Sequence, residues 1–204
     1  MTQRPAFGQA ARALLRDTVL DATGELLREH SWAQVTMAQV AKAAGVSRQT
    51  LYNEFGDRQG LGQAYLLREG ERLLGAVQAS IDVHRDAPRS ALEAAFATFL
   101  ADVQDSPILE AIADPEGGEG LLALLTTQGE PVLAFARARL AAMLTARWPQ
   151  VTAADAEALA EHLVRLAISH AALPTGTPQQ AAATVAGILA PHLDALLGRS
   201  ALAA

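Results

Sequence analysis

The chain has 204 residues, of which 50% are hydrophobic, 19% charged and 4% aromatic, and its formal net charge is −6. This balance is typical of a folded globular protein and excludes a disordered or collagen-like chain. The absence of cysteine excludes disulfides and a cysteine nucleophile, and is expected of a cytoplasmic protein. Neither a signal peptide nor a continuous apolar run of about 18 residues stands out, so we expect no membrane partner.

Stretches rich in Ala, Leu, Arg and Glu, separated by clusters of Pro and Gly, predict an all-α fold. In chain order, we expect helices at residues 8–29, 36–43, 47–54, 58–83, 88–105, 107–113, 119–147, 153–173 and 178–198. In the first helix, a stripe at helical spacing is expected to pack on the core: Leu15, Val19, Ala22 and Leu26.

Charge divides the chain into two unequal parts. Residues 1–58 carry seven basic and six acidic side chains, whereas the remaining residues carry nine basic and sixteen acidic ones. Attraction to phosphates is local at physiological salt, so a surface for nucleic acid is expected only in the N-terminal part. We expect a small three-helix domain over residues 1–57 and a larger helical domain over residues 58–204.

Residues 36–55, TMAQVAKAAGVSRQTLYNEF, predict two short helices joined by a tight turn. Thr36 opens a capping box for the first helix, and Ser47 is placed to cap the second. Gly45 can adopt the positive φ that a tight turn requires, and Leu51 can fill the space between the helices. This pattern is typical of a helix-turn-helix, whose second helix enters the major groove of DNA. A plain helical hairpin is the alternative.

The second of these helices carries side chains that favour DNA recognition over a plain hairpin. Arg48, Gln49, Thr50 and Asn53 lie in its first turns and can hydrogen-bond base edges or phosphates. We expect these four residues to set the sequence preference, and Tyr52 to contact a phosphate.

The segment VTMAQVAKAAGVSRQTLYNEFGDRQGL, within residues 10–62, resembles the DNA-binding domain of the TetR family. The residues that match the family pattern are Thr36, Gly45, Val46, Ser47, Thr50, Leu51, Tyr52, Phe55 and Arg58. The resemblance implies a transcriptional repressor that binds a palindromic operator as a homodimer and is released by a small ligand. We expect Thr36, Ser47, Tyr52 and Arg58 mainly to position the DNA backbone, although the family more often has lysine at the last of these positions.

Three charged side chains near the motif have less certain partners. The carboxylate of Glu54 would be repelled by DNA phosphates, so we expect it to point away from the DNA or to pair with Arg58. Arg12 and Arg16 fit a solvated helix face and a contact to DNA equally well.

The larger domain is rich in apolar side chains, which fit either a plain core or the wall of a ligand pocket. The side chains expected to line a pocket are Phe96, Phe99, Leu100, Val103, Leu121, Leu125, Gln128, Phe135, Met143 and His170. The expected ligand is a long apolar molecule such as a fatty acid or an alkyl ester, because each buried methylene contributes about 0.8 kcal/mol.

A polar headgroup on such a ligand would need a polar partner. The candidates are Thr127, Gln128, Arg137, Arg165 and His170. For the two arginines the alternative is pairing with Glu130 and Glu161, and for His170 it is a place in the core or an interface. The segments TTQGEP and LVRLAISHAALPTG are further similar to actinobacterial TetR-type regulators associated with alkane and lipid metabolism or lipid export.

The last two expected helices, 153–173 and 178–198, carry stripes that predict a four-helix homodimer interface. The stripes are Leu159, Leu163, Leu166 and His170, and Val185, Ile188, His192 and Leu196. The sequence contains no HExxH, triad or nucleotide-loop motif, so we expect neither an enzyme nor a bound metal or cofactor. The rival interpretation is a helical lipid-binding or carrier module without specific DNA binding.

Overall fold

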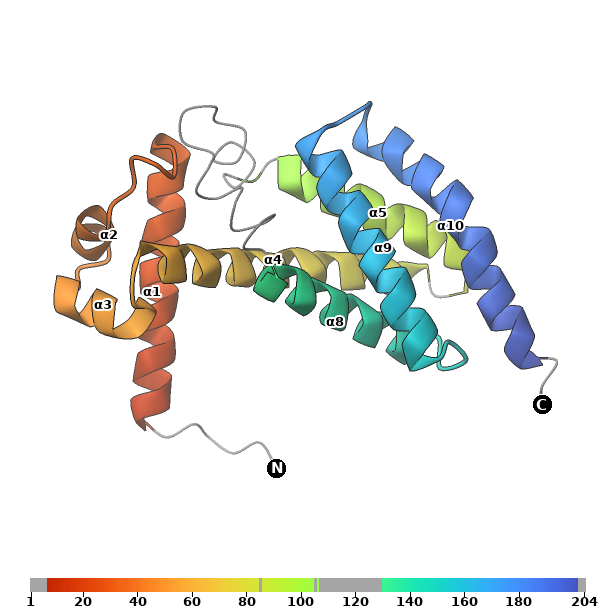
Figure 1. The fold of residues 1–204 in the computed structure, drawn as a ribbon, viewed down its shortest axis with the longest axis horizontal. Coiled ribbons are helices and arrows are strands. Elements are labelled where there is room, and N and C mark those ends of the chain that lie inside the picture. The colour runs from red at the N-terminus through yellow and green to blue at the C-terminus, as the bar shows by residue number, and fades with distance from the viewer. Residues whose placement is uncertain (1–6, 85, 105, 107–129, 202–204) are drawn as a thin grey trace. The chain divides into compact units, whose positions relative to one another are not determined.

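The computed structural model of the chain describes residues 7–84, 86–104, 106 and 130–201. Within these ranges all regular elements are α-helices, in the order α1 (Phe7–Glu29), α2 (Met37–Ala43), α3 (Arg48–Phe55), α4 (Arg58–Val83), α5 (Pro88–Gln104), α8 (Glu130–Arg147), α9 (Ala153–Ala172) and α10 (Pro178–Ala201) (Figure 1). The predicted all-α class is confirmed. The expected helix at 107–113 and residues 119–129 of the next one lie outside the described residues.

The chain forms two compact units that meet within α4, between Arg68 and Glu69. Of the described residues, the N-terminal unit contains α1, α2, α3 and the first part of α4. The C-terminal unit contains the rest of α4 together with α5, α8, α9 and α10. The division by packing thus falls later in the chain than the expected boundary after residue 57, which assigned all of α4 to the second domain.

The core of the N-terminal unit is built from apolar side chains of all four of its helices and the loop between α1 and α2. Its buried members include Val19, Leu20, Leu27, Trp32, Val35, Val40, Leu51, Phe55, Leu61 and Tyr65. Leu51 is only 1% exposed, as expected for the residue that fills the space between α2 and α3. A Cβ at Gly60 would overlap the carbonyl oxygen of Phe55, so glycine permits the close approach of α4 to the end of α3.

The buried face of α1 is turned from the expected stripe. Val19 is buried as predicted, but Leu15, Ala22 and Leu26 are only half-buried. The fully buried residues of α1 are Val19, Leu20, Thr23 and Leu27. The apolar pattern missed this face because Thr23 is polar; its hydroxyl donates a 2.9 Å hydrogen bond to the carbonyl of Val19, which satisfies it inside the core.

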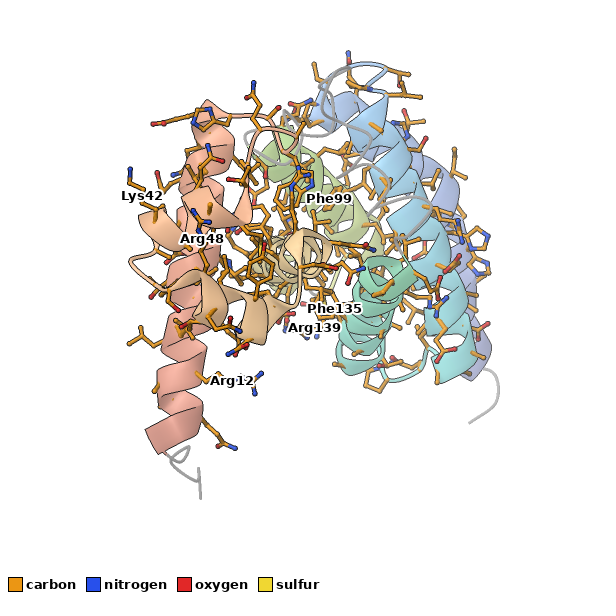
Figure 2. The ribbon with its side chains drawn as sticks, turned by 60° about the vertical axis from the view of Figure 1, so that its left-hand side comes forward. Arg12, Lys42, Arg48, Phe99, Phe135 and Arg139 are labelled. Atoms are coloured by element: carbon orange, nitrogen blue, oxygen red, sulfur yellow. The ribbon has the colours of Figure 1, made fainter. Side chains whose placement is uncertain are left out.

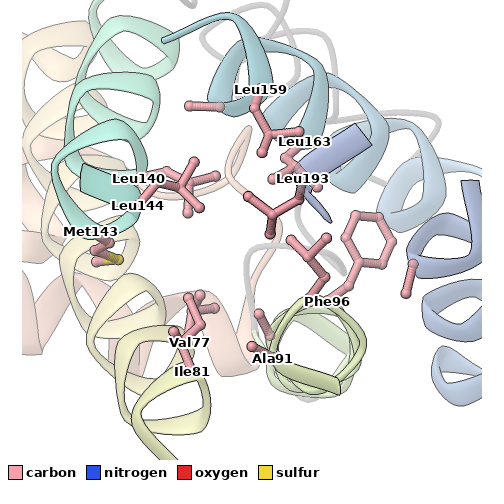
Figure 3. Packing of buried hydrophobic residues seen from close by; sticks show 14 of the residues in the cluster. Val77, Ile81, Ala91, Phe96, Leu140, Met143, Leu144, Leu159, Leu163 and Leu193 are labelled. Carbon is pink, nitrogen blue, oxygen red and sulfur yellow. The ribbon is translucent and has the colours of Figure 1, made fainter. Parts of the chain in front are cut away.

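The C-terminal unit is held together by one apolar cluster, to which all of its described helices contribute (Figure 3). The most extensive helix pairs are α5 with α10 and α8 with α9. Figure 3 shows Val77 and Ile81 of α4 close to Ala91 of α5, with Leu140 and Leu144 of α8 on another side of the same cluster. The unit therefore buries one continuous core.

Helix α10 is more apolar than we expected from the sequence. Its segment Pro178–Gly198 is long and apolar enough to cross a membrane by length and composition. Gln179, Thr184, His192 and Asp194 interrupt the segment, so it is not a continuous apolar run of the kind sought in the sequence. The segment is rich in alanine, and α10 packs along α5 with Ala182, Val185 and Leu193 buried in the core. These contacts are those of a core helix, although only 33% of the segment is buried.

We expect Leu51→Ala to lower the free energy of unfolding of the N-terminal unit by about 2–5 kcal/mol, because it leaves a cavity between α2 and α3. Leu14→Ala on α1 is the matched control, since Leu14 is 69% exposed, and its effect should stay within about 0.5 kcal/mol. Urea denaturation followed by circular dichroism measures both. Equal effects of the two substitutions would contradict the assignment of Leu51 to the core.

Candidate nucleic-acid interface

The two short helices α2 and α3 are started by the side chains that the sequence singled out. The hydroxyl of Thr36 accepts a 3.3 Å hydrogen bond from the backbone N–H of Gln39, and the Gln39 side chain accepts one of 2.8 Å from the N–H of Thr36. The hydroxyl of Ser47 accepts a 3.0 Å bond from the N–H of Thr50. Between the helices, Gly45 has a φ of 67°, the left-handed conformation that glycine adopts without strain. The structure thus has the local geometry of a helix-turn-helix.

The start of α3 presents polar side chains to solvent. Arg48, Gln49, Tyr52 and Asn53 are exposed, with 47% of Tyr52 accessible, while Thr50 is half-buried. The side-chain amide of Gln49 donates a 2.9 Å hydrogen bond to the amide oxygen of Asn53, one turn later on the same face. Asparagine and glutamine amides are side chains that can read base edges.

Thr50 and Ser47 are less free to make new contacts, because their hydroxyls lie 2.8 Å apart and share the cap of α3.

One further basic residue belongs with this surface, although sequence reasoning did not select it. Lys42 in the last turn of α2 is exposed and precedes Arg48, the first residue of α3, by six positions; both are labelled in Figure 2. The signal that could have found it is its place at the end of the first motif helix.

Glu54 pairs with α1 and not with Arg58, which corrects one of the two expectations for it. Its carboxylate accepts hydrogen bonds from Arg12 Nε at 2.8 and 3.0 Å and from a terminal guanidinium nitrogen of Arg16 at 2.7 Å. Desolvation by itself would raise the pKa of Glu54, but the hydrogen bonds and charges of Arg16 and Arg12 outweigh it and hold the pKa below its ordinary value. Arg12 and Arg16 are therefore not simply a solvated face.

Arg58 lies against the loop between α1 and α2. Its guanidinium is 4.7 Å from the centre of the Trp32 ring and donates a hydrogen bond to the Trp32 carbonyl. Desolvation lowers the pKa of Arg58, but an arginine keeps its charge at any physiological pH. These contacts are those of a residue that joins α4 to the loop between α1 and α2.

The residues expected to line a ligand pocket in the C-terminal unit belong mostly to its core. Phe96, Leu100, Val103 and Met143 are buried, and Phe99 and Phe135 pack against the apolar cluster from its edge. Figure 2 labels Phe99 and Phe135 on different helices of this unit. The remaining expected residues Leu121, Leu125, Thr127 and Gln128 lie outside the described residues.

His170 is half-buried and makes an edge-to-face contact with Phe96, with ring centres 5.8 Å apart. His170 and Leu100 border a cavity of about 10 Å³ at the loop between α9 and α10, which is room for about one water molecule.

The expected headgroup partners Arg137 and Arg165 instead pair with Glu161, at 3.1 and 2.5 Å. Of the two acidic partners expected for these arginines, the structure therefore uses Glu161 for both.

The stripes expected to form a dimer interface are divided between the core and the surface. Leu159, Leu163, Val185 and Leu196 are buried within the C-terminal unit, which corrects their assignment to an outer face. Ile188 is 70% exposed, and the exposed side of α10 around it also carries Ala183, Thr184, Gly187, Pro191, His192, Asp194 and Ala195. Apolar side chains occur on both sides of α10, so its sequence pattern could not separate the two faces.

Two family models match the chain. One, described as "Bacterial regulatory proteins, tetR family", matches residues 19–65, and the other, described as "Bacterial Tetracyclin repressor, C-terminal domain", matches residues 86–191. The chain is 40% identical over 192 residues to the HTH-type transcriptional regulator AlkX of Mycobacterium tuberculosis, across 94% of this chain and 91% of that protein. It is 34% identical over 199 residues to the uncharacterized HTH-type transcriptional regulator Rv1255c of the same species, across 88% and 94%.

A solved structure is similar over the same length. It is the crystal structure of the TetR family repressor AlkX from Dietzia sp. strain DQ12-45-1b, which is implicated in biodegradation of n-alkanes. The two structures agree with a TM-score of 0.80 at 38% sequence identity, covering 89% of this chain and 96% of that one. The similarity therefore includes both units and is not confined to the helix-turn-helix.

The low pKa of Glu54 predicts how stability depends on pH. A carboxyl group whose pKa is lower in the folded than in the unfolded protein stabilises the fold above the unfolded value of 4.5, and loses this contribution as the pH falls through the folded value. The wild type should therefore lose its advantage in unfolding free energy over Glu54→Gln as the pH falls below about 4.5. Denaturation at a series of pH values measures this difference, and a difference independent of pH would contradict the ion pairs.

Proposed function

The chain belongs to the TetR family of bacterial transcriptional regulators, and from this premise we propose that it is a repressor that binds a palindromic operator as a homodimer and releases it when a small apolar ligand binds. The observation that carries the DNA-binding part is the exposed polar face of α3, which is capped by Ser47 and backed by the buried Leu51. A helix held in this way can enter the major groove with its first turns against the base edges.

Contacts in this proposal divide into two classes. Arg48, Gln49 and Asn53 have exposed side chains that reach base edges, and Thr50 joins them from the edge of the same face. Thr36, Ser47 and Tyr52 lie around this face and contact the phosphate backbone. For Arg58 we propose a mainly structural role on Trp32, because its guanidinium already stacks on that ring.

The first test is a fluorescence-anisotropy titration of the full chain with a duplex from the region upstream of its own gene. A random duplex of the same length is the reference, and both are measured at two salt concentrations. A regulator binds the upstream duplex more tightly, and both affinities fall with salt because phosphate contacts release counterions. Equal affinity for both duplexes would favour the rival carrier module.

Substitutions on α3 and at Arg58, the first residue of α4, should separate base contacts from structural ones. Arg48→Ala or Asn53→Ala should weaken binding of the upstream duplex by about 1–3 kcal/mol per lost base contact and leave random DNA nearly unchanged. Arg58→Ala should lower the melting temperature without changing the slope of affinity against salt. A slope reduced by about one unit would instead assign Arg58 to a phosphate.

The homodimer interface is proposed to lie on α9 and α10. Support comes from α10, which is apolar enough to span a membrane by length and composition yet leaves the large apolar side chain of Ile188 70% exposed beside Gly187 and Pro191. A face of this kind is expected to be covered by another protein surface, and isologous dimers are the commonest oligomers.

Ile188→Glu should convert the dimer into a monomer, because it places a charge at an apolar interface. Val83→Glu is the matched control, since Val83 at the end of α4 is 77% exposed and lies outside the proposed interface. Light scattering at micromolar concentration measures the mass of both variants. A monomeric wild type would refute the proposed assembly.

The proposed ligand is a long apolar molecule such as a fatty acid or an alkyl ester. Support comes from the apolar cluster around Phe96, Leu100 and Met143, and from the similarity to a repressor implicated in n-alkane biodegradation. The ligand must bind the DNA-incompetent state of the dimer more tightly than the competent one, since only differential affinity shifts that equilibrium.

Native mass spectrometry of the purified protein, followed by DNA titrations with and without palmitate, tests this ligand class. We expect a co-purified lipid or a fall in affinity for the upstream duplex when palmitate is added. If neither occurs with long-chain acids, the fatty-acid proposal fails while the DNA-binding proposal stands.

A further inference from the structure

Glu54 is an unexpected residue for a helix that faces DNA. It lies in the last turn of α3, where the helix dipole disfavours a negative charge, and DNA phosphates would repel it as well. Nevertheless the structure keeps it ionised and nearly buried, with 9% of its side chain exposed. Because both the helix dipole and DNA phosphates disfavour the negative charge of Glu54, another interaction has to stabilise that charge.

The compensation comes from two successive turns of α1. Arg12 and Arg16 donate hydrogen bonds to both carboxylate oxygens of Glu54, at distances between 2.7 and 3.0 Å. Arg16 also lies 4.9 Å from the ring centre of Phe55, the next residue of α3. The end of α3 is thus tied to α1 by charged hydrogen bonds, which have a preferred direction, and not only by apolar packing, which has none.

We propose that Glu54 is a positioning residue for DNA recognition, which through Arg12 and Arg16 fixes the orientation of α3 on α1. This inference rests on the proposed DNA-binding function. The other end of α3 is joined to α2 by the turn at Gly45, and the ion pairs at Glu54 hold the last turn of α3 on α1 beside the buried Phe55. Two points define the direction of a short helix, and hence the approach of Arg48, Gln49 and Asn53 to the bases.

If Glu54 acted only by repelling DNA, its substitution would change DNA affinity differently from the loss of a positioning residue. If the carboxylate only repels phosphates, its removal strengthens binding to all DNA sequences alike. If it orients α3, its removal weakens the operator contacts while binding to random DNA stays the same or rises. The ratio of the two affinities therefore separates the two roles, and a general loss of folding does not imitate this change.

The test uses the full chain and the two duplexes described above, one from the region upstream of its own gene and one random. The variants are Glu54→Ala, Glu54→Gln, which keeps the shape without the charge, and Glu54→Asp as the conservative rescue. Glu25→Gln is the control, because Glu25 is an exposed carboxylate of α1 paired only locally with Arg28. Melting curves by circular dichroism establish that each variant is folded.

We expect Glu54→Ala and Glu54→Gln to lower the preference for the upstream duplex at least about tenfold, which corresponds to about 1.4 kcal/mol. Glu54→Asp should restore part of this preference, and Glu25→Gln should leave it unchanged. Because Glu54 acts through the arginines, adding Glu54→Ala to an Arg12→Ala, Arg16→Ala background should cause little further loss.

An unchanged preference in folded Glu54 variants would overturn the positioning role, and so would losses that add fully to those of the arginine substitutions. Stronger binding of both duplexes alike would assign Glu54 the purely electrostatic role. In each of these cases the wild type still prefers the upstream duplex, and the proposed function stands. A wild type without that preference would instead overturn the proposed function, and the inference with it.

Discussion

Helix α3 has only 8 residues, and a helix of this length is not stable in water without external contacts. Its stability comes from residues that do not face the DNA. Ser47 caps its first turn, Leu51 and Phe55 are buried beneath it, and Glu54 is tied to α1 at its end. Because these contacts stabilise the helix, its remaining face is free to carry side chains selected for recognition.

The parts of this arrangement that depend on neighbouring residues could be predicted from the sequence. Capping joins residues three positions apart, and a positive φ requires glycine, so Thr36, Ser47 and Gly45 were recognisable in the sequence. The helix boundaries followed from the same local signals and from apolar periodicity. The residues proposed to face the bases are those that the caps and the buried Leu51 leave exposed.

Contacts between distant residues could not be predicted in this way. Arg12 and Glu54 are 42 positions apart, and Arg58 and Trp32 are 26 apart, so only the folded chain brings each pair together. Electrostatics correctly indicated that Glu54 needed a cation, but several arginines could have supplied it. The face of α1 was missed for a different reason, since a satisfied threonine can occupy a core position that apolar patterns do not count.

In the C-terminal unit, the pattern of apolar residues along a helix does not distinguish its buried face from its exposed face. On α10, Val185 is buried within the unit while Ile188, three residues later, is 70% exposed. A helix that is apolar on all sides satisfies the pattern of a core helix, an interface helix and a membrane span at once. Packing against α5 identifies one of its faces, and the other, which is exposed, is the face proposed above for a second subunit.

Helix α4 belongs to both units, and this restricts how a ligand could act. Its first residue, Arg58, stacks on Trp32, while Leu74, Val77 and Ile81 are buried in the C-terminal core. A ligand that entered this core would have to repack side chains around Leu74 and Val77, because close-packed interiors do not accommodate extra volume without movement. Such repacking would therefore act on the same helix whose first residue contacts the loop between α1 and α2, and this helix is where the proposed coupling between ligand and DNA is to be sought.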